Sequence, residues 1–213
     1  MKKLVRNVSV GLALSLCLAS VIPAQAIESN TLGDEIFPRE RVEMLQSQYA
    51  DMPIYLDKDV APSSLAPASL NGSYPTRKGV ILQTDDAYKG LIPTGHAAIV
   101  YSSSKVVESI SSGVVLGNNN WSSTKKTCYG LSVIGTSMEN DAAAANWSYR
   151  QIGKPYNYNY LNRDRRDKFY CSQLVWAAYK DNFGIDLDTS EFGNAVHPVE
   201  LRKSSRTYTI YQK

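Results

Sequence analysis

Histidine and cysteine are scarce in this chain of 213 residues, which holds two histidines and three cysteines. Because these few side chains stand in separate sequence contexts, they do not form a convincing zinc site. The sequence also has no glycine-rich phosphate loop of the kind that nucleotide-binding enzymes use. Lys and Arg total 23 against 20 Asp and Glu, so no basic patch indicates a nucleic-acid partner. These absences predict a protein that needs neither a metal nor an organic cofactor.

The first 26 residues have the three parts of a secretory signal peptide. A positive start (Lys2, Lys3 and Arg6) precedes an apolar core from Val8 to Ile22, and Ala24–Ala26 supply a small-x-small cleavage pattern. The apolar run is too short for an unaided transmembrane helix, so we expect export without a stable membrane anchor. Cleavage removes three positive charges and no negative ones, which leaves 20 of each sign and a formal net charge of zero.

Two cysteines remain after cleavage, because Cys17 lies within the predicted signal core. In an exported protein the simplest expectation is a disulfide between Cys128 and Cys171. The alternative is a reactive thiol. The segment FYCSQLVW places Cys171 in the first turn of a predicted helix, where the positive helix end and a nearby imidazolium lower the pKa of a thiol. The helix position favours the reactive thiol, and the sequence leaves both interpretations open.

The mature chain is predicted to consist of an N-terminal extension, residues 27–73, and one compact domain, residues 74–213. The extension holds one candidate amphipathic helix, Pro38–Tyr49. A stretch rich in Pro, Ser and Ala follows, Val60–Tyr74, and is typical of a linker. A prosegment, a lid or a spacer would all fit this composition.

The compact domain combines short apolar strands with two longer helices. The helix candidates, Ser137–Ile152 and Cys171–Phe183, are each followed by a glycine. The mixture predicts an α+β fold in which helices pack on one small antiparallel sheet. The last strand candidate is expected to close one edge of that sheet, and the candidates in chain order are Gly79–Gln83, Gly95–Tyr101, Lys105–Ile110, Gly113–Leu116, Tyr129–Ile134 and Arg206–Tyr211.

His96 and Glu108 lie on two of these strands, which flank a Ser-rich turn. If residues 102–104 form a three-residue turn, Ala98 lies opposite Glu108, and His96 becomes its diagonal neighbour on the same face. A carboxylate there can accept a hydrogen bond from the imidazole, fix its tautomer and stabilise the imidazolium. A one-residue change in the turn would place the two side chains on opposite faces. The other histidine, His197, precedes a proline in a loop, and we expect it to be structural.

Six segments follow one another in the order of a known family: GVIL, GHAAIVY, VVES, GKPYNY, FYCSQLVWAAY and HPVELRKS. Together they resemble the circularly permuted branch of the NlpC superfamily of papain-like cysteine hydrolases, and most closely its YaeF/YiiX-type group. The resemblance covers about residues 78–204, and YCSQLVW is its most specific part. His96 precedes Cys171 by 75 residues, which is the permuted order. One departure is Val80, because many relatives have an acidic residue after that glycine.

The resemblance implies a papain-like fold with a Cys-His-Glu triad and no cofactor. Cys171 matches the nucleophile, His96 the base and Glu108 the residue that orients the base. Tyr156 in GKPY is similar to a tyrosine that helps to position the substrate or the oxyanion. Tyr170, next to the nucleophile, is an alternative for that role.

Three functions are compatible with these features. The resemblance and the signal peptide together imply an exported cysteine amidase or peptidase that cleaves a small amide, such as a peptidoglycan stem peptide, through a thioester acyl-enzyme. A lipid-acting acyltransferase or thioesterase would use the same triad, because the motifs do not define the acyl group. A non-catalytic envelope-binding module would instead tie Cys128 to Cys171. The sequence leaves the cleaved bond, the final extracytoplasmic compartment and the oligomeric state open.

Overall fold

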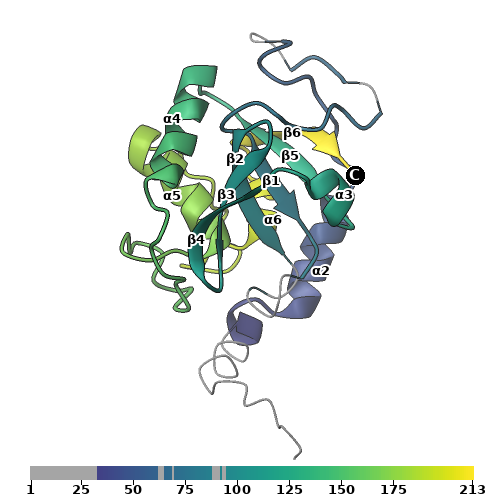
Figure 1. Cartoon of the computed structure of the whole chain (residues 1–213). Helices are drawn as coiled ribbons and strands as arrows, with labels where there is room; N and C mark the ends of the chain where they lie inside the picture. Colours follow the sequence, from purple (N-terminus) through teal and green to yellow (C-terminus); the bar gives the residue numbers. More distant parts are fainter. Residues whose placement is uncertain (1–32, 62–64, 69, 88–91, 93–94) are drawn as a thin grey trace, which may run out of the picture.

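The computed structural model describes residues 33–61, 65–68, 70–87, 92 and 95–213, so the predicted signal peptide lies outside the described residues. One antiparallel sheet forms the centre of the molecule, with six strands in the order β4-β3-β2-β1-β5-β6 (Figure 1). Its strands are β1 Ile81–Thr84, β2 His96–Ser102, β3 Lys105–Ile110, β4 Gly113–Asn118, β5 Tyr129–Val133 and β6 Thr207–Gln212.

Alternating side chains divide the apolar residues of the sheet between two buried clusters. Ile81, Ile99 and Val107 belong to the larger cluster, to which α4, α5 and α6 contribute. Leu82 and Ala98 point into a smaller second cluster. None of the helices among the described residues is both long and apolar enough to cross a membrane. The labelled helices are α2 Arg39–Gln48, α3 Trp121–Thr124, α4 Met138–Tyr149, α5 Cys171–Phe183 and α6 Pro198–Lys203.

The predicted α+β class is confirmed, and each predicted strand and helix overlaps an observed one. The sheet closes at one edge with β6, as expected. Two helices were not predicted, α3 with four residues and α6 with six. Segments this short do not complete enough turns to show a helical period in the sequence.

The hairpin of β2 and β3 has the register on which the sequence argument depends. Ala98 pairs with Glu108 and Ile99 with Val107, as expected, but the predicted three-residue turn is wrong: Ser102 pairs with Lys105, so the turn holds only residues 103–104. A register shift between Val100 and Ser102 supplies the extra residue that keeps Ala98 opposite Glu108. Two strand positions before Ala98 lies His96, which therefore shares a face with Glu108. The strand start that carries His96 thus lies beside the strand end that carries Glu108.

The described part of the N-terminal extension packs against the domain. Phe37, Val42 and Leu45 are buried and belong to the larger cluster, together with residues of α5 and the sheet. Further along the extension, Ile54 forms a parallel bridge with Thr209 of β6. The predicted amphipathic helix Pro38–Tyr49 implies one apolar face, but the sequence did not show which part of the domain that face contacts. The domain boundary at residue 74 stays a prediction.

A buried ionic cluster fastens the extension to the helices. Asp141 of α4 is fully buried, and its Oδ2 accepts hydrogen bonds from Lys58 Nζ and from Arg77 Nη1, both at 2.8 Å. Its other oxygen accepts from the Thr136 hydroxyl at 2.6 Å. Arg77 also donates to Asp57 from two nitrogens, at 2.7 and 2.9 Å. Removing the charge of Asp141 would leave two buried cations facing each other.

We therefore expect Asp141→Asn to lower the free energy of unfolding by about 3–5 kcal/mol, the cost of breaking a buried ion pair from one side. Urea unfolding of the variant and the parent measures this difference. Asp167→Asn is the matched control, because Asp167 pairs with Arg165 on an exposed surface and should be neutral. Equal stability of Asp141→Asn and the parent would contradict the structural role of this cluster.

Candidate active site

Cys171 is the first residue of α5, and its side chain is nearly buried, with 2% relative exposure. The neighbouring residues hold this helix start in place. The Ser172 hydroxyl donates to the carbonyl of Val196 at 2.6 Å, and the Tyr170 amide donates to Gln173 Oε1 at 3.1 Å. The thiol therefore stands at the positive end of a fixed helix, which favours a negative charge on the sulfur.

His96 and Glu108 form a hydrogen-bonded pair, with 2.6 Å between His96 Nε2 and Glu108 Oε2. The imidazole is 1% exposed and the carboxylate side chain 12%, so little water competes for this bond. The start of α5 is joined to the end of β3, because the Ser109 hydroxyl donates to the carbonyl of Phe169 at 2.6 Å. This link brings the helix start to the end of the sheet where His96 lies.

The remaining ring nitrogen of His96, Nδ1, is the one left for Cys171. Burial alone would lower the pKa of His96, but hydrogen bonding to Cys171 and the charges of Cys171 and Glu108 raise it to about 9. The imidazole consequently keeps its proton at neutral pH, between the Cys171 sulfur and the Glu108 carboxylate. The structure thus brings together all three residues that the sequence predicted as a triad.

Trp121 covers this pair and was missed by the sequence analysis. Its ring stacks on the His96 ring with 5.4 Å between centroids and 26° between planes. The Trp121 amide donates to the hydroxyl of Tyr74 at 2.9 Å, which fixes the start of α3. A large aromatic residue within the polar stretch from Asn118 to Lys126 was the available signal, because such a residue needs a partner to be buried.

We expect Trp121→Ala to lower kcat about tenfold, because water then reaches the hydrogen bond between His96 and Glu108 and weakens it. Steady-state kinetics and circular dichroism measure activity and folding together. Trp121→Phe keeps an aromatic ring over His96 and should retain most of the activity. If Trp121→Ala were folded and fully active, the covering role would be wrong.

The two predicted tyrosines have different surroundings. The Tyr170 hydroxyl accepts a hydrogen bond from the Val196 amide at 3.0 Å and donates to the carbonyl of Tyr160 at 3.2 Å. It is therefore occupied within the core. The Tyr156 hydroxyl is buried and has no hydrogen-bond partner among the described residues. Burial, and after it the charges of Tyr160 and Cys171, raise the pKa of Tyr156 well above its usual value, so the phenol stays protonated and able to donate.

An amide pair ties the tyrosine-rich loop to α5. Asn157 Nδ2 donates to Gln173 Oε1 at 3.0 Å, and Gln173 Nε2 donates to the carbonyls of Arg163 and Arg165 at 2.8 and 3.1 Å. The sequence analysis did not single out these amides, because the two residues lie on different segments. They hold Tyr156, the neighbour of Asn157, beside the helix that carries Cys171.

The remaining cysteine and histidine lie in other environments. Cys128 and Cys171 are both free and belong to different buried clusters, so the predicted alternative of a disulfide between them is not formed. Burial raises the pKa of Cys128 to about 12, which keeps that thiol protonated. His197 is fully buried and caps α6, because its Nδ1 accepts from the Val199 amide at 3.1 Å. It has the structural environment that the sequence suggested.

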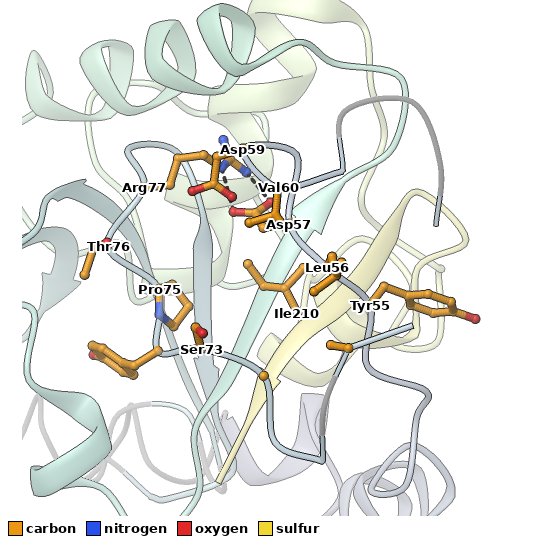
Figure 2. A pocket seen from close by; sticks show the side chains of 13 residues that line it. Tyr55, Leu56, Asp57, Asp59, Val60, Ser73, Pro75, Thr76, Arg77 and Ile210 are labelled. Atoms are coloured by element: carbon orange, nitrogen blue, oxygen red, sulfur yellow. Dashed lines mark hydrogen bonds and ion pairs between the residues drawn. The ribbon is translucent and has the colours of Figure 1, made fainter. Parts of the chain in front are cut away.

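A hollow of about 290 Å³ lies between the extension and β6 (Figure 2). The ion pair of Asp57 and Arg77 forms part of its wall, and Ile210 of β6 lines it. None of the five predicted site residues lines it. The candidate active site is therefore defined by the start of α5 and the end of the sheet, and not by this hollow.

Comparison with known proteins gives a family, a relative and a solved structure. Residues 92–202 match a family described as permuted papain-like amidase enzyme, YaeF/YiiX, C92 family. The chain is 31% identical over 160 residues to the "Uncharacterized protein YycO" of Bacillus subtilis (strain 168), a match that covers 73% of this chain. The chain spans 64% of the length of that curated relative.

One solved structure with a similar fold is the crystal structure of YiiX from Escherichia coli O157:H7, with a TM-score of 0.52 and 18% identity. It covers 66% of this chain and 99% of that one, and at this identity it supports the fold alone. Its title calls that protein a metalloprotein. Among the residues described for the present chain, no group of three or more His, Cys, Asp or Glu side chains could hold a metal ion. By the family match, the chain belongs to the permuted papain-like amidases of the YaeF/YiiX type.

Proposed function

We propose that this chain is an exported cysteine hydrolase that cleaves an amide bond with Cys171 as nucleophile, His96 as acid and base, and Glu108 as the orienting carboxylate. The observation that carries the proposal is the position of His96. One ring nitrogen lies 2.6 Å from Glu108, and the same ring hydrogen-bonds to Cys171 at the start of α5. This arrangement supports the assignment of Cys171 as the nucleophile, His96 as the base and Glu108 as the group that orients the base.

The chemistry follows from this arrangement. With the proton already on His96, the Cys171 sulfur attacks the substrate carbonyl carbon, so that an S–C bond forms and the C=O π bond opens. The Cys171 amide, which as the first residue of α5 has no partner within the helix, donates to the oxyanion together with the Tyr156 hydroxyl. His96 then gives its proton to the leaving amine as the C–N bond breaks. Water hydrolyses the thioester, and the acid product leaves.

A second candidate keeps the triad and changes the acyl group. Tyr158 and Leu161 are large apolar side chains of the same loop and are 41% and 50% exposed. The Tyr158 ring lies 4.8 Å from the ring of Tyr156. Exposed apolar side chains at this place would suit a substrate with an apolar acyl chain. This observation supports a lipid-acting acyltransferase or thioesterase as the alternative.

A substrate panel separates the two candidates. It pairs small peptide amides, including a peptidoglycan stem tripeptide, with acyl thioesters of increasing chain length. Each substrate is offered with and without an alcohol as acyl acceptor. We expect kcat/KM to be highest for the peptide amides and insensitive to the alcohol. A kcat/KM that increases with acyl chain length, with transfer to the alcohol, would favour the acyltransferase instead.

Export is a separate part of the proposal, supported by the composition of residues 1–26. Expression of the full chain in a bacterial host should give an extracytoplasmic protein. Its intact mass should correspond to a chain that begins at Ile27. The substrate would then be met outside the cytoplasm, which fits a small peptide or amide derived from the cell envelope. Recovery of the uncleaved chain from the cytoplasm would contradict this part without affecting the chemistry.

A further inference from the structure

Two phenol hydroxyls beside the start of α5 are buried without a partner. Neither Tyr156 Oη nor Tyr160 Oη has a hydrogen-bond partner among the described residues. The two side chains are 4% and 0% exposed. Leaving a buried hydroxyl unpaired costs free energy, and this site contains two such groups side by side. Such groups are expected where a ligand completes the hydrogen bonding.

Tyr160 is placed next to both tyrosines of the candidate site. Its ring centroid lies 6.5 Å from that of Tyr156 and 5.3 Å from that of Tyr170, the residue before Cys171. After the larger effect of burial, the two phenols affect each other's pKa through charge and through side-chain hydrogen bonding, so the two hydroxyls lie close together, although too far apart for a hydrogen bond of ordinary length. Because Tyr170 directly precedes Cys171, its contact with Tyr160 places the Tyr160 ring beside the start of α5.

The far side of Tyr160 is held by the N-terminal extension. Phe37 packs against the Tyr160 ring with 5.3 Å between centroids, and it also contacts Phe192 at 5.3 Å and His197 at 5.1 Å. Phe37 is fully buried. It lies outside residues 92–202, so this support does not belong to the part of the chain that the family match covers.

We propose that Tyr160 is a positioning residue of the oxyanion site and that Phe37 of the extension holds it there. This inference rests on the proposed function. In the substrate complex the Tyr160 hydroxyl donates to Tyr156 Oη, and the Tyr156 proton points at the oxygen of the attacked carbonyl. The extension is then a working part of the active site and neither a spacer nor a removable prosegment.

The proposal explains why the orphaned hydroxyls are retained. If Tyr160 served packing alone, phenylalanine would fill the same space without an unpaired hydroxyl and would be at least as stable. If the hydroxyl instead acts when negative charge develops on the substrate oxygen, it contributes to the rate and not to the stability of the free protein. Its removal leaves the fold unchanged and weakens the transition state.

The test compares Tyr160→Phe with the parent in four measurements: thermal unfolding, steady-state kinetics, alkylation of Cys171 by iodoacetamide, and the affinity of N-acetyl-alanyl-alaninal. The aldehyde adds to the thiol, so that an S–C bond forms, the C=O π bond opens and the proton from His96 goes to the oxygen. That oxygen occupies the oxyanion position, whereas alkylation creates no such oxygen.

We expect Tyr160→Phe to lower kcat and the aldehyde affinity about tenfold, the effect of one weakened hydrogen bond. KM and the alkylation rate should stay at parent values. The unfolding temperature should stay the same or rise. Tyr179→Phe is the matched control, because its hydroxyl is also buried but donates to the carbonyl of Gly79 at 2.7 Å. That control should lose stability and keep the aldehyde affinity.

Phe37→Leu tests the contribution of the extension. It should lower the aldehyde affinity in the parent background and have no further effect when combined with Tyr160→Phe, because both changes act through one hydroxyl. Additive losses would overturn the role of Phe37.

The aldehyde also separates this inference from the proposed function. If the parent binds the aldehyde but cleaves no amide, the proposed amide hydrolysis fails, and the affinity ratio still tests Tyr160. Parent-like aldehyde affinity in Tyr160→Phe would overturn the positioning role. Failure of the parent to form an aldehyde adduct would overturn both.

Discussion

Cys171→Ala should lower kcat/KM for the best amide substrate by about 10⁴-fold or more, down to the background rate of the folded protein. The proposed mechanism has no other nucleophile, because His96 and Glu108 act through the sulfur. The variant should still fold, since alanine fits the first position of α5 and Cys171 makes no disulfide. Kinetics with the best substrate, together with circular dichroism, would measure both.

Cys128→Ala is the matched control for this experiment. Both cysteines are free and buried, but burial raises the pKa of Cys128 to about 12 and no imidazole is paired with it in the structure described. This variant should keep parent activity, and iodoacetamide at neutral pH should label Cys171 and spare Cys128. Loss of activity in Cys128→Ala with retention in Cys171→Ala would reverse the assignment of the nucleophile.

The sheet and the relative placement of His96 and Glu108 could be predicted because they depend on local patterns. The Ser-rich turn after Ser102, together with the register shift between Val100 and Ser102, sets the pairing of Ala98 with Glu108, and this register decides which side chains join His96. The helix that starts at Cys171 was equally evident, since an apolar face and the closing Gly184 define its length. Local patterns did not show that the start of this helix lies beside the strand end that carries His96. That expectation came from the resemblance to the family, through the order of its motifs.

The supporting residues could not be predicted because their partners are distant in the sequence. Trp121 of α3 stacks on His96 of β2, and Phe37 packs on Tyr160, which lies far from it along the chain. No periodicity within either segment reports such contacts. The extension showed the same difficulty, because its predicted amphipathic helix implied an apolar face without indicating the distant residues against which Phe37, Val42 and Leu45 pack.

The structure also narrows the three sequence-based functions. A binding module required a bond between Cys128 and Cys171, and both are free in different clusters. The two catalytic functions both need a charged sulfur and an imidazolium beside it. The pKa of His96, about 9, fits an imidazolium in this place, because burial alone would have lowered that pKa below its usual value. The choice between amide and lipid substrates depends on the loop with Tyr158 and Leu161, which the substrate panel tests.

His96→Asn should lower kcat/KM about 10³–10⁴-fold, because asparagine can keep a hydrogen bond to Glu108 but cannot accept the thiol proton or protonate the leaving amine. Iodoacetamide labelling of Cys171 at neutral pH should slow in the same variant, since the imidazolium that stabilises the thiolate is gone. Glu108→Gln is the graded control. It retains the histidine and should lose less activity than His96→Asn. Parent-like hydrolysis by a folded His96→Asn protein would remove His96 from the mechanism.

The pH dependence of the parent separates the role of His96 as proton donor from the role of Cys171 as nucleophile. The pKa of the group is raised to about 9, so the imidazolium is present below this pH and is lost as the pH rises through it. Above pH 9 the leaving amine has no proton donor, and kcat/KM for amides should fall. Alkylation needs only the thiolate and no proton donor, so its rate should not fall over the same range. A parallel loss of both rates above pH 9 would indicate unfolding rather than loss of the general acid. Divergence of the two curves would therefore assign the proton transfer to His96 and the nucleophile to Cys171 in one titration.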